Sequence, residues 1–67
     1  MIGQQIRTID HAINWCVKGH QRIAIKCKDG SFAEHSFNVL AIMPLKTVLK
    51  KLDQGSIYEV HRNEHPH

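Results

Sequence analysis

The stretch RIAIKCKDGSFAEHSF, residues 22–37, contains the clearest structural signal in the sequence. Apolar and polar residues alternate over 22–28, which is typical of a strand with one buried face. Asp29-Gly30 follows, and an Asp-Gly pair after an alternating run indicates a β-hairpin. We therefore predict a strand over 22–28, a tight turn and a returning strand over 31–37.

The length of the turn decides which side chains of the returning strand are buried, because a shift of one residue moves every side chain to the other face. A two-residue loop would place Ile25 opposite Glu34. We favour a three-residue loop over 28–30 with Gly30 in the left-handed conformation, because it leaves Glu34 outside. The side chains on the apolar face are then Ala33, His35 and Phe37.

Upstream of the hairpin, apolar residues recur at steps of three and four, the spacing of one face of an α-helix. Gly19 follows Lys18, and a glycine after a cation is a typical helix end. We therefore predict a helix over 3–18. Trp15 lies off the centre of its apolar stripe and could contact either the core or a partner. The stripe consists of Ile2, Ile6, Ile9, Ile13, Cys16 and Val17.

Downstream of the hairpin, residues 39–43 form a short apolar run that ends before Pro44. Proline pushes the residue before it toward extended geometry, so we predict a buried strand or a buried extended segment here. Pro44 suits the first turn of a helix, and Gly55 suits its end. The apolar stripe of this helix follows the i, i+3, i+4, i+7 pattern and consists of Leu45, Val48, Leu49 and Leu52.

A last strand is expected over 56–61, followed by a polar, frayed tail over 62–67. The order α-β-β-(β)-α-β predicts one small α+β domain over residues 1–67, with the helices packed on one face of a small sheet. A small closed barrel behind an N-terminal helix would compete if 45–52 were a strand, but the helical spacing of the leucines argues against it. A chain of 67 residues has room for one domain and a small core.

Two cysteines, Cys16 and Cys27, are too few for a disulfide scaffold in so short a chain. We expect both to be reduced and buried in a cytoplasmic protein, since a bridge between them would require an oxidising compartment. No apolar run approaches the length of about 18 residues that a membrane helix needs, so no contact with a membrane is expected. The N-terminus lacks the pattern of a signal peptide.

Six basic side chains are the main candidates for binding a partner. Alternation places three of them on one face of the first hairpin strand, and the other three crowd the exposed side of the second helix. If the two surfaces adjoin, they form a positive patch suited to phosphates; if not, they are the solvated faces of any soluble domain. The six are Arg22, Lys26, Lys28, Lys46, Lys50 and Lys51.

The chain has only four aromatic residues, so few rings are available to stack on bases. Phe32 and Tyr58 are the two that we expect to be exposed. Three large side chains have no obvious place in so small a core. They either complete the core or form an exposed interface through which two copies of the chain would associate as a homodimer. These three are Trp15, Phe32 and Met43.

No residue pattern indicates catalysis. The six carboxylates form no pair by spacing, and a chain of this size lacks room for a deep pocket that excludes water. Histidines gather at the C-terminus, but a structural zinc site needs four ordered ligands, which a frayed tail does not supply. We therefore predict no enzymatic activity, no cofactor and no metal site.

From Asp10 to Gly30, the order of features resembles the small Rho-binding antiterminator family. The shared features are Asp10, Cys16 six residues later, a β-rich stretch and the run over 28–30, with Leu52-Asp53 near the last strand. The resemblance implies an Sm-like barrel behind a helix, with Rho as partner. It covers about a third of the chain, and the middle of the chain is shorter than the barrel requires. We therefore do not assign the chain to this family.

The sequence thus predicts a small non-enzymatic binding module, a cytoplasmic regulatory or accessory protein. Its basic surface would contact nucleic acid or an acidic protein. The alternative is a protein–protein adaptor that acts through an apolar surface as a homodimer.

Overall fold

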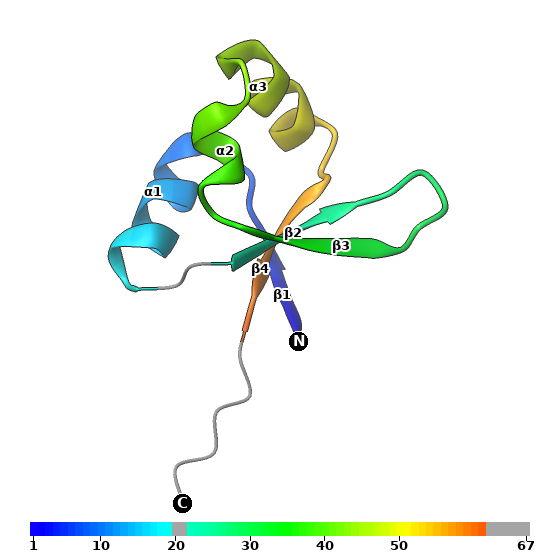
Figure 1. Cartoon of the computed structure of the whole chain (residues 1–67), viewed down its shortest axis with the longest axis horizontal. Helices are drawn as coiled ribbons and strands as arrows, with labels where there is room; N and C mark the ends of the chain where they lie inside the picture. The colour runs from blue at the N-terminus through cyan, green and yellow to red at the C-terminus, as the bar shows by residue number, and fades with distance from the viewer. Residues whose placement is uncertain (20–21, 62–67) are drawn as a thin grey trace, which may run out of the picture.

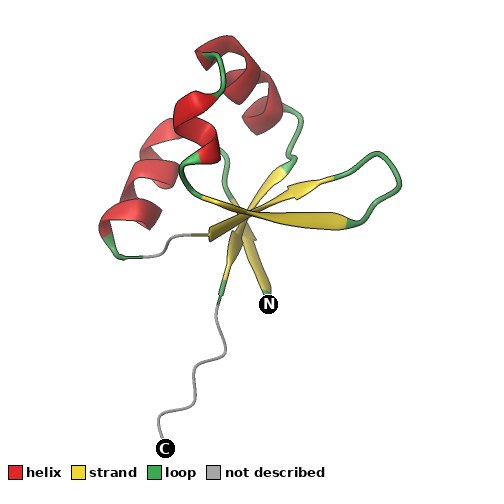
Figure 2. Cartoon of the chain, in the orientation of Figure 1, coloured by secondary structure: helices red, strands yellow, loops and turns green. Residues whose placement is uncertain are grey.

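The computed structural model describes residues 1–19 and 22–61. The described chain forms a small α+β domain, as predicted, with all helices on one side of a twisted antiparallel sheet (Figures 1 and 2). The predicted tail over 62–67 lies outside the described residues. The elements are β1 (Ile2–Gln5), α1 (Ile9–Val17), β2 (Arg22–Lys26), β3 (Phe32–Ser36), α2 (Val39–Ile42), α3 (Leu45–Asp53) and β4 (Ile57–Val60).

The sheet has the strand order β1-β4-β2-β3, and each neighbouring pair is antiparallel. The last strand of the described chain therefore lies inside the sheet, between β1 and β2. Its register with β2 places Ile23 opposite Glu59 and Ile25 opposite Ile57. Ile23 and Ile57 are fully buried in the core beneath the helices, so this row of side chains points to the covered side of the sheet.

The hairpin has the predicted three-residue loop. The backbone N–H of Cys27 donates to the carbonyl oxygen of Ser31 at 2.7 Å, and Gly30 has a φ of 90°. Glycine adopts this conformation without the steric penalty of a Cβ atom. Ile25 therefore pairs with Ala33, and the predicted register is confirmed.

The helix predicted over 3–18 is wrong in its first third, because Ile2–Gln5 form β1 and pair with β4. The helix begins at Ile9, where the side chain of Thr8 caps it by accepting a hydrogen bond from the His11 N–H at 3.0 Å. Short apolar runs fit a strand and a helix alike. Residues 2–5 form a strand because they pair with the edge of β4, which is distant in sequence.

The helix α1 also turns a different face to the core than the apolar stripe predicts. Ala12 and Trp15 are buried, whereas Ile13 is 52% and Val17 78% exposed. The indole of Trp15 has the largest area to bury, and its N–H donates to the carbonyl oxygen of Arg22 at 3.1 Å. Burial of this one ring outweighs burial of the smaller aliphatic side chains and sets the rotation of the helix.

Both cysteines are free and exposed, so the expectation that they are buried is wrong. Cys16 follows Trp15 on α1 and is carried outward by the rotation of the helix. Cys27 directly follows β2, at the start of the turn that leads to β3. This end of the hairpin extends away from the helices (Figure 1).

Residues 39–42 form the short helix α2, so the predicted strand or extended segment is wrong. Only Met43 has extended geometry, with φ −76° and ψ 146°, because the steric effect of Pro44 acts on the one residue before it. A helical turn brings Val39, Leu40 and Met43 to the same side, and all three pack against the core.

The third helix ends as the sequence predicts. Gly55 has a φ of 71°, and its N–H donates to the carbonyl oxygen of Leu52 at 3.1 Å. The N–H of Ser56 donates to the carbonyl oxygen of Lys51 at 3.0 Å. This pair of hydrogen bonds is the Schellman motif, which closes a helix with a left-handed glycine. Only half of the predicted stripe is buried, however, since Val48 is covered and its neighbours Leu45 and Leu49 are exposed.

The rotation of α1 can be tested by two alanine variants. Trp15→Ala should lower the free energy of unfolding by about 3–5 kcal/mol, the usual effect of removing a large buried ring. Val17→Ala removes an exposed side chain from the same helix and should change it by less than about 0.5 kcal/mol. Urea denaturation in dilute solution, followed by circular dichroism, measures both. If Val17→Ala has the larger effect, α1 is turned as the apolar stripe predicts; if Trp15→Ala does not fold, Trp15→Phe replaces it.

Candidate functional site

A buried carboxylate is the most unusual feature of the covered side of the sheet. Glu59 is 7% exposed and is the one buried charged residue among residues 1–19 and 22–61. Alternation along β4 places it on the same side as Ile57, beneath α1. Burying a carboxylate is costly unless hydrogen bonds and opposite charges compensate for the lost water.

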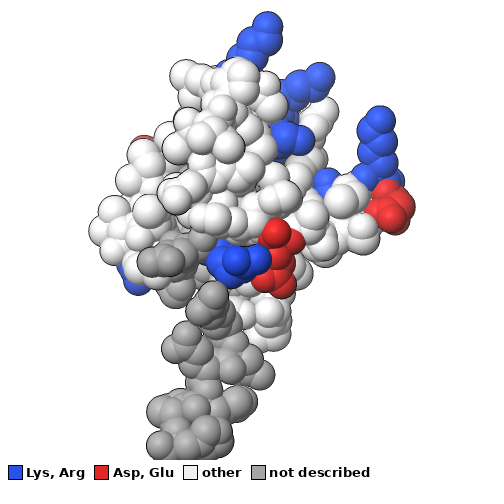
Figure 3. Space-filling view, in the orientation of Figure 1, with Lys and Arg blue, Asp and Glu red and all other residues white. Residues whose placement is uncertain are grey.

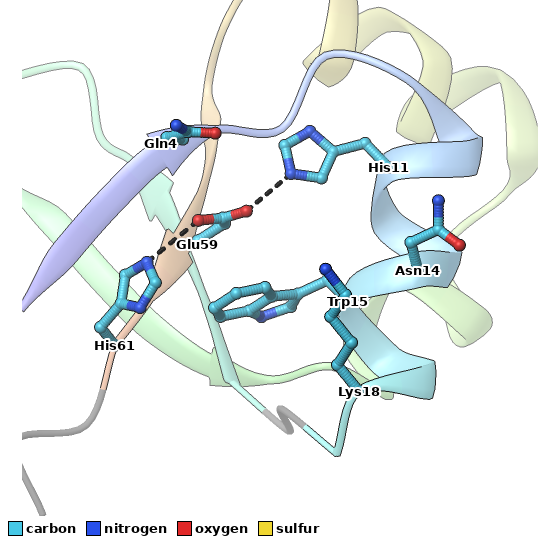
Figure 4. Close-up of a pocket in the computed structure, with 7 residues that line it drawn as sticks. All are labelled: Gln4, His11, Asn14, Trp15, Lys18, Glu59 and His61. Carbon is cyan, nitrogen blue, oxygen red and sulfur yellow. Dashed lines mark hydrogen bonds and ion pairs between the residues drawn. The ribbon is translucent and has the colours of Figure 1, made fainter.

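Two imidazoles, shown in Figure 4, and the backbone amide of Gln4 provide this compensation. His11 Nε2 lies 2.7 Å from Oε2 of Glu59, and His61 Nε2 lies 3.0 Å from Oε1. Burial by itself would raise the pKa of Glu59. Hydrogen bonds from His11, His61 and the N–H of Gln4 outweigh this effect and hold the pKa below its ordinary value of 4.5. The carboxylate is therefore ionised at neutral pH, and it accepts a hydrogen bond from the Nε2–H of each imidazole.

The cluster connects three elements, of which β4 is far from the other two in sequence. His11 lies on α1, Glu59 on β4 and Gln4 on β1. A β-bulge or irregularity between Ile2 and Gln5 shifts the register of β1 against β4 at this point. A Cβ atom at Gly3 would collide with the ring of His61, so a glycine is needed there for His61 to reach Glu59.

A half-open pocket of about 450 Å³ lies over the cluster. One face of α1 forms a wall of it, because His11, Asn14, Trp15 and Lys18 follow the i, i+3, i+4, i+7 pattern (Figure 4). In the described part of the chain, no buried polar side-chain atom lacks a hydrogen-bond partner. The polar groups beneath the pocket therefore satisfy one another, and the cluster fastens α1 to the sheet.

The described residues contain no group of three or more His, Cys, Asp or Glu side chains that could hold a metal ion. Geometry explains why the cluster is not such a group. His11 and His61 approach opposite oxygens of one carboxylate, so their Nε2 atoms do not converge on a common point.

The three residues of the predicted apolar interface lie in different environments. Trp15 is buried in the core, where its ring meets that of His61 edge-on, with centroids 5.0 Å apart. Met43 packs against the core at the end of α2. Phe32 alone of the three is exposed, on the other side of the sheet.

The uncovered side of the sheet carries a pair of aromatic rings. Phe32 on β3 and Tyr58 on β4 meet edge to face, with centroids 5.1 Å apart and planes at 82°. Ala24 on β2 lies between the two strands, opposite Tyr58 on one side and Glu34 on the other. Its methyl group leaves room for rings from the flanking strands to meet, and Ala24 itself is fully buried.

The six predicted basic residues fall into separate groups. Arg22 lies at the start of β2 and pairs with Glu34 at 3.2 Å, both side chains being exposed. Lys26 is opposite Phe32 near the hairpin end of β2, and Lys28 lies in the turn. The remaining three, Lys46, Lys50 and Lys51, lie on α3.

The hairpin and the end of α3 lie next to each other. The N–H of Lys26 donates to the carbonyl oxygen of Ser56 at 2.8 Å, and the N–H of Ser56 donates to the carbonyl oxygen of Lys51 at 3.0 Å. Figure 3 shows basic side chains at intervals along this side of the molecule, from α3 to the tip of the hairpin. The structure therefore brings Lys26 of the hairpin close to Lys51 at the end of α3, whereas Arg22 lies at the other end of β2.

Sequence reasoning missed the cluster around Glu59. A signal was present, because the strand predicted over 56–61 places Glu59 at the same parity as Ile57, where an apolar residue would be expected. His11 gave no signal, since its contact with Glu59 spans 48 positions.

Comparison of the chain with protein-family models, curated proteins and solved structures finds no match. The partial resemblance to the Rho-binding antiterminators is therefore unsupported, and the described sheet has two edges, β1 and β3, rather than the closed path of a barrel. Within the described residues, no helix has the length and apolar character needed to cross a bilayer.

The lowered pKa of Glu59 predicts how stability depends on pH. The carboxylate of Glu59 is protonated near pH 4.5 in the unfolded chain and at lower pH in the folded chain. Its contribution to the free energy of unfolding is therefore complete above pH 4.5 and is lost as the pH falls through the pKa of the folded state. Glu59→Gln should lower the free energy of unfolding at neutral pH and flatten its decline in acid. Urea denaturation from neutral pH to well below 4.5 measures this difference.

The matched control is Glu34→Gln, which removes an exposed carboxylate. This variant should keep the wild-type acid profile. Asp29, whose pKa is lowered by hydrogen bonds from Ser31, is present in all three proteins and cancels in the comparison. An unchanged acid profile in Glu59→Gln would show that the cluster does not stabilise the fold.

Proposed function

We propose that this protein binds single-stranded nucleic acid on the side of the sheet that the helices leave uncovered. The observation that carries the proposal is the pair of Phe32 and Tyr58 on this side, with Lys26 directly opposite Phe32. In this proposal the domain is an accessory or regulatory protein of the cytoplasm that binds without catalysing a reaction.

Aromatic rings on the surface of a sheet are a suitable platform for unpaired bases, because every base has a face that can stack on them. Both rings were expected to be exposed, but Tyr58 is half-buried, so Phe32 is the ring that is more open to a base. Phe32 is 39% exposed, and its contact with Tyr58 holds the ring in place before any base arrives. Such preorganisation reduces the conformational entropy lost on binding.

Basic side chains beside the rings would contact the phosphates. Lys26 lies opposite Phe32 and Lys28 lies in the adjoining turn, whereas the lysines of α3 lie on the covered side of the sheet, with the end of α3 next to the hairpin. Contacts with phosphates give affinity without sequence preference and weaken as salt rises. Arg22 contributes less in this proposal, because Glu34 already pairs with it.

An acidic protein is the other candidate partner of the same basic side, and it would need the lysines but not the rings. The competing adaptor model loses the centre of its proposed surface, since Trp15 is buried. The aromatic pair favours nucleic acid over both.

The proposal predicts a specific result in an NMR titration of the labelled protein with a short single-stranded RNA and a short DNA duplex. Shifts should be larger with the single strand, should centre on Phe32, Tyr58 and Lys26, and should fade as salt rises. Phe32→Ala should weaken binding about 5- to 150-fold, which corresponds to about 1–3 kcal/mol for a stacked base.

The double variant Lys26→Glu, Lys50→Glu should abolish binding at moderate salt. Arg7→Glu, Lys18→Glu is its matched control, because it makes the same change in net charge at exposed residues outside the proposed surface. Equal loss in both double variants would mean that binding depends on net charge alone and would contradict the proposal. Loss in the lysine variant with no effect of Phe32→Ala would mean that the protein contacts only the phosphates, and it would contradict stacking of bases on the rings.

A further inference from the structure

We infer that the proposed nucleic-acid site prefers guanine and that the carboxylate of Glu34 reads this base. The inference rests on the proposed function and goes beyond it, because stacking on rings and contacts with phosphates carry little preference for a particular base. The described strands hold two carboxylates. Glu59 lies on the covered side of the sheet, whereas Glu34 lies on the side that carries the aromatic pair.

Glu34 lies beside the more open of the two rings. It follows Phe32 by two positions on β3, so both side chains point to the same side of the sheet, about 7 Å apart along the strand. The register agrees, since Ala24 is opposite Glu34 on one neighbouring strand and opposite Tyr58 on the other. Lys26 faces Phe32 from across the strand pair. One ring is therefore flanked by a cation suited to a phosphate and by a carboxylate suited to the edge of a stacked base.

The carboxylate of Glu34 is oriented and open to a ligand. Nε of Arg22 donates to its Oε1 at 3.2 Å, and the side chain of Glu34 is 48% exposed. An ion pair this exposed adds little to stability, so the fold does not depend on it. The hydrogen bonds among the described residues leave Oε2 of this carboxylate open, and Oε1 retains a second lone pair.

The chemistry of a carboxylate selects guanine among the four bases. An ionised carboxylate accepts hydrogen bonds and donates none. Guanine presents two neighbouring donors on its Watson–Crick edge, N1–H and the 2-amino group, which match the two oxygens of one carboxylate. Adenine and cytosine present one amino group beside a ring nitrogen that accepts, and uracil presents one N–H between two carbonyl oxygens. In these three bases an acceptor would face the carboxylate and be repelled by it.

Binding of short single-stranded RNAs to the protein, measured by fluorescence anisotropy at moderate salt, tests the inference. The probes are a run of uridines and the same run with one central guanosine or one central inosine, a base that lacks the 2-amino group. The guanosine probe should bind about 5- to 150-fold more tightly than the uridine probe, the range expected for a bidentate contact with a base edge. The inosine probe should lose most of this gain.

Glu34→Gln replaces one carboxylate oxygen by an NH2 group, which donates. This variant should lose the preference for guanosine and still bind the uridine probe. The matched control is Asp10→Asn, which makes the same change in net charge at an exposed residue of α1 and should keep the preference.

The outcomes separate the inference from the proposed function. Equal binding of the three probes overturns the inference and leaves the proposed function intact. The same holds if inosine binds as tightly as guanosine, or if the preference for guanosine survives Glu34→Gln. If none of the probes binds, the proposed function fails, and the inference fails with it.

Discussion

The position of β4 between β1 and β2 is the constraint on which the rest of the structure depends. The last strand of the described chain pairs with the first on one side and with the hairpin on the other. The sheet is therefore complete only when β1, near the start of the described chain, has paired with β4, near its end. Contacts across such distances must overcome the entropy of closing a long loop, so they are sustained by the burial of Ile23 and Ile57 that accompanies them.

The same strand supplies both of the unusual features of the protein, one on each side of the sheet. Glu59 points beneath the helices and fastens α1 through His11, whereas Tyr58 points to the uncovered side and meets Phe32. Alternation along a single strand thus separates a structural cluster from the surface proposed for binding. The polar groups around Glu59 satisfy one another within the described residues, so the cluster holds α1 against the sheet by its own hydrogen bonds.

The helical layer has two sides with different surroundings. Its inner side completes a small core, to which α1 contributes Ala12 and Trp15 and α3 contributes Val48 and Leu52. Its outer side leaves Ile42 of α2 and Leu45 of α3 exposed next to charged side chains such as Lys46. So small a domain has too little sheet to cover every apolar side chain of its helices.

The sequence by itself determined the features that depend on near neighbours. These are the hairpin with its left-handed Gly30, the helix that ends at Gly55 and the α+β class, because turn residues and hydrophobic periodicity act over a few positions. The tertiary structure alone decided that residues 2–5 are a strand, which way α1 is turned and where Glu59 finds its partners. Each of these follows from contacts between residues that are remote in the chain, with the edge of β4, the area of the Trp15 ring and the buried carboxylate as the physical causes.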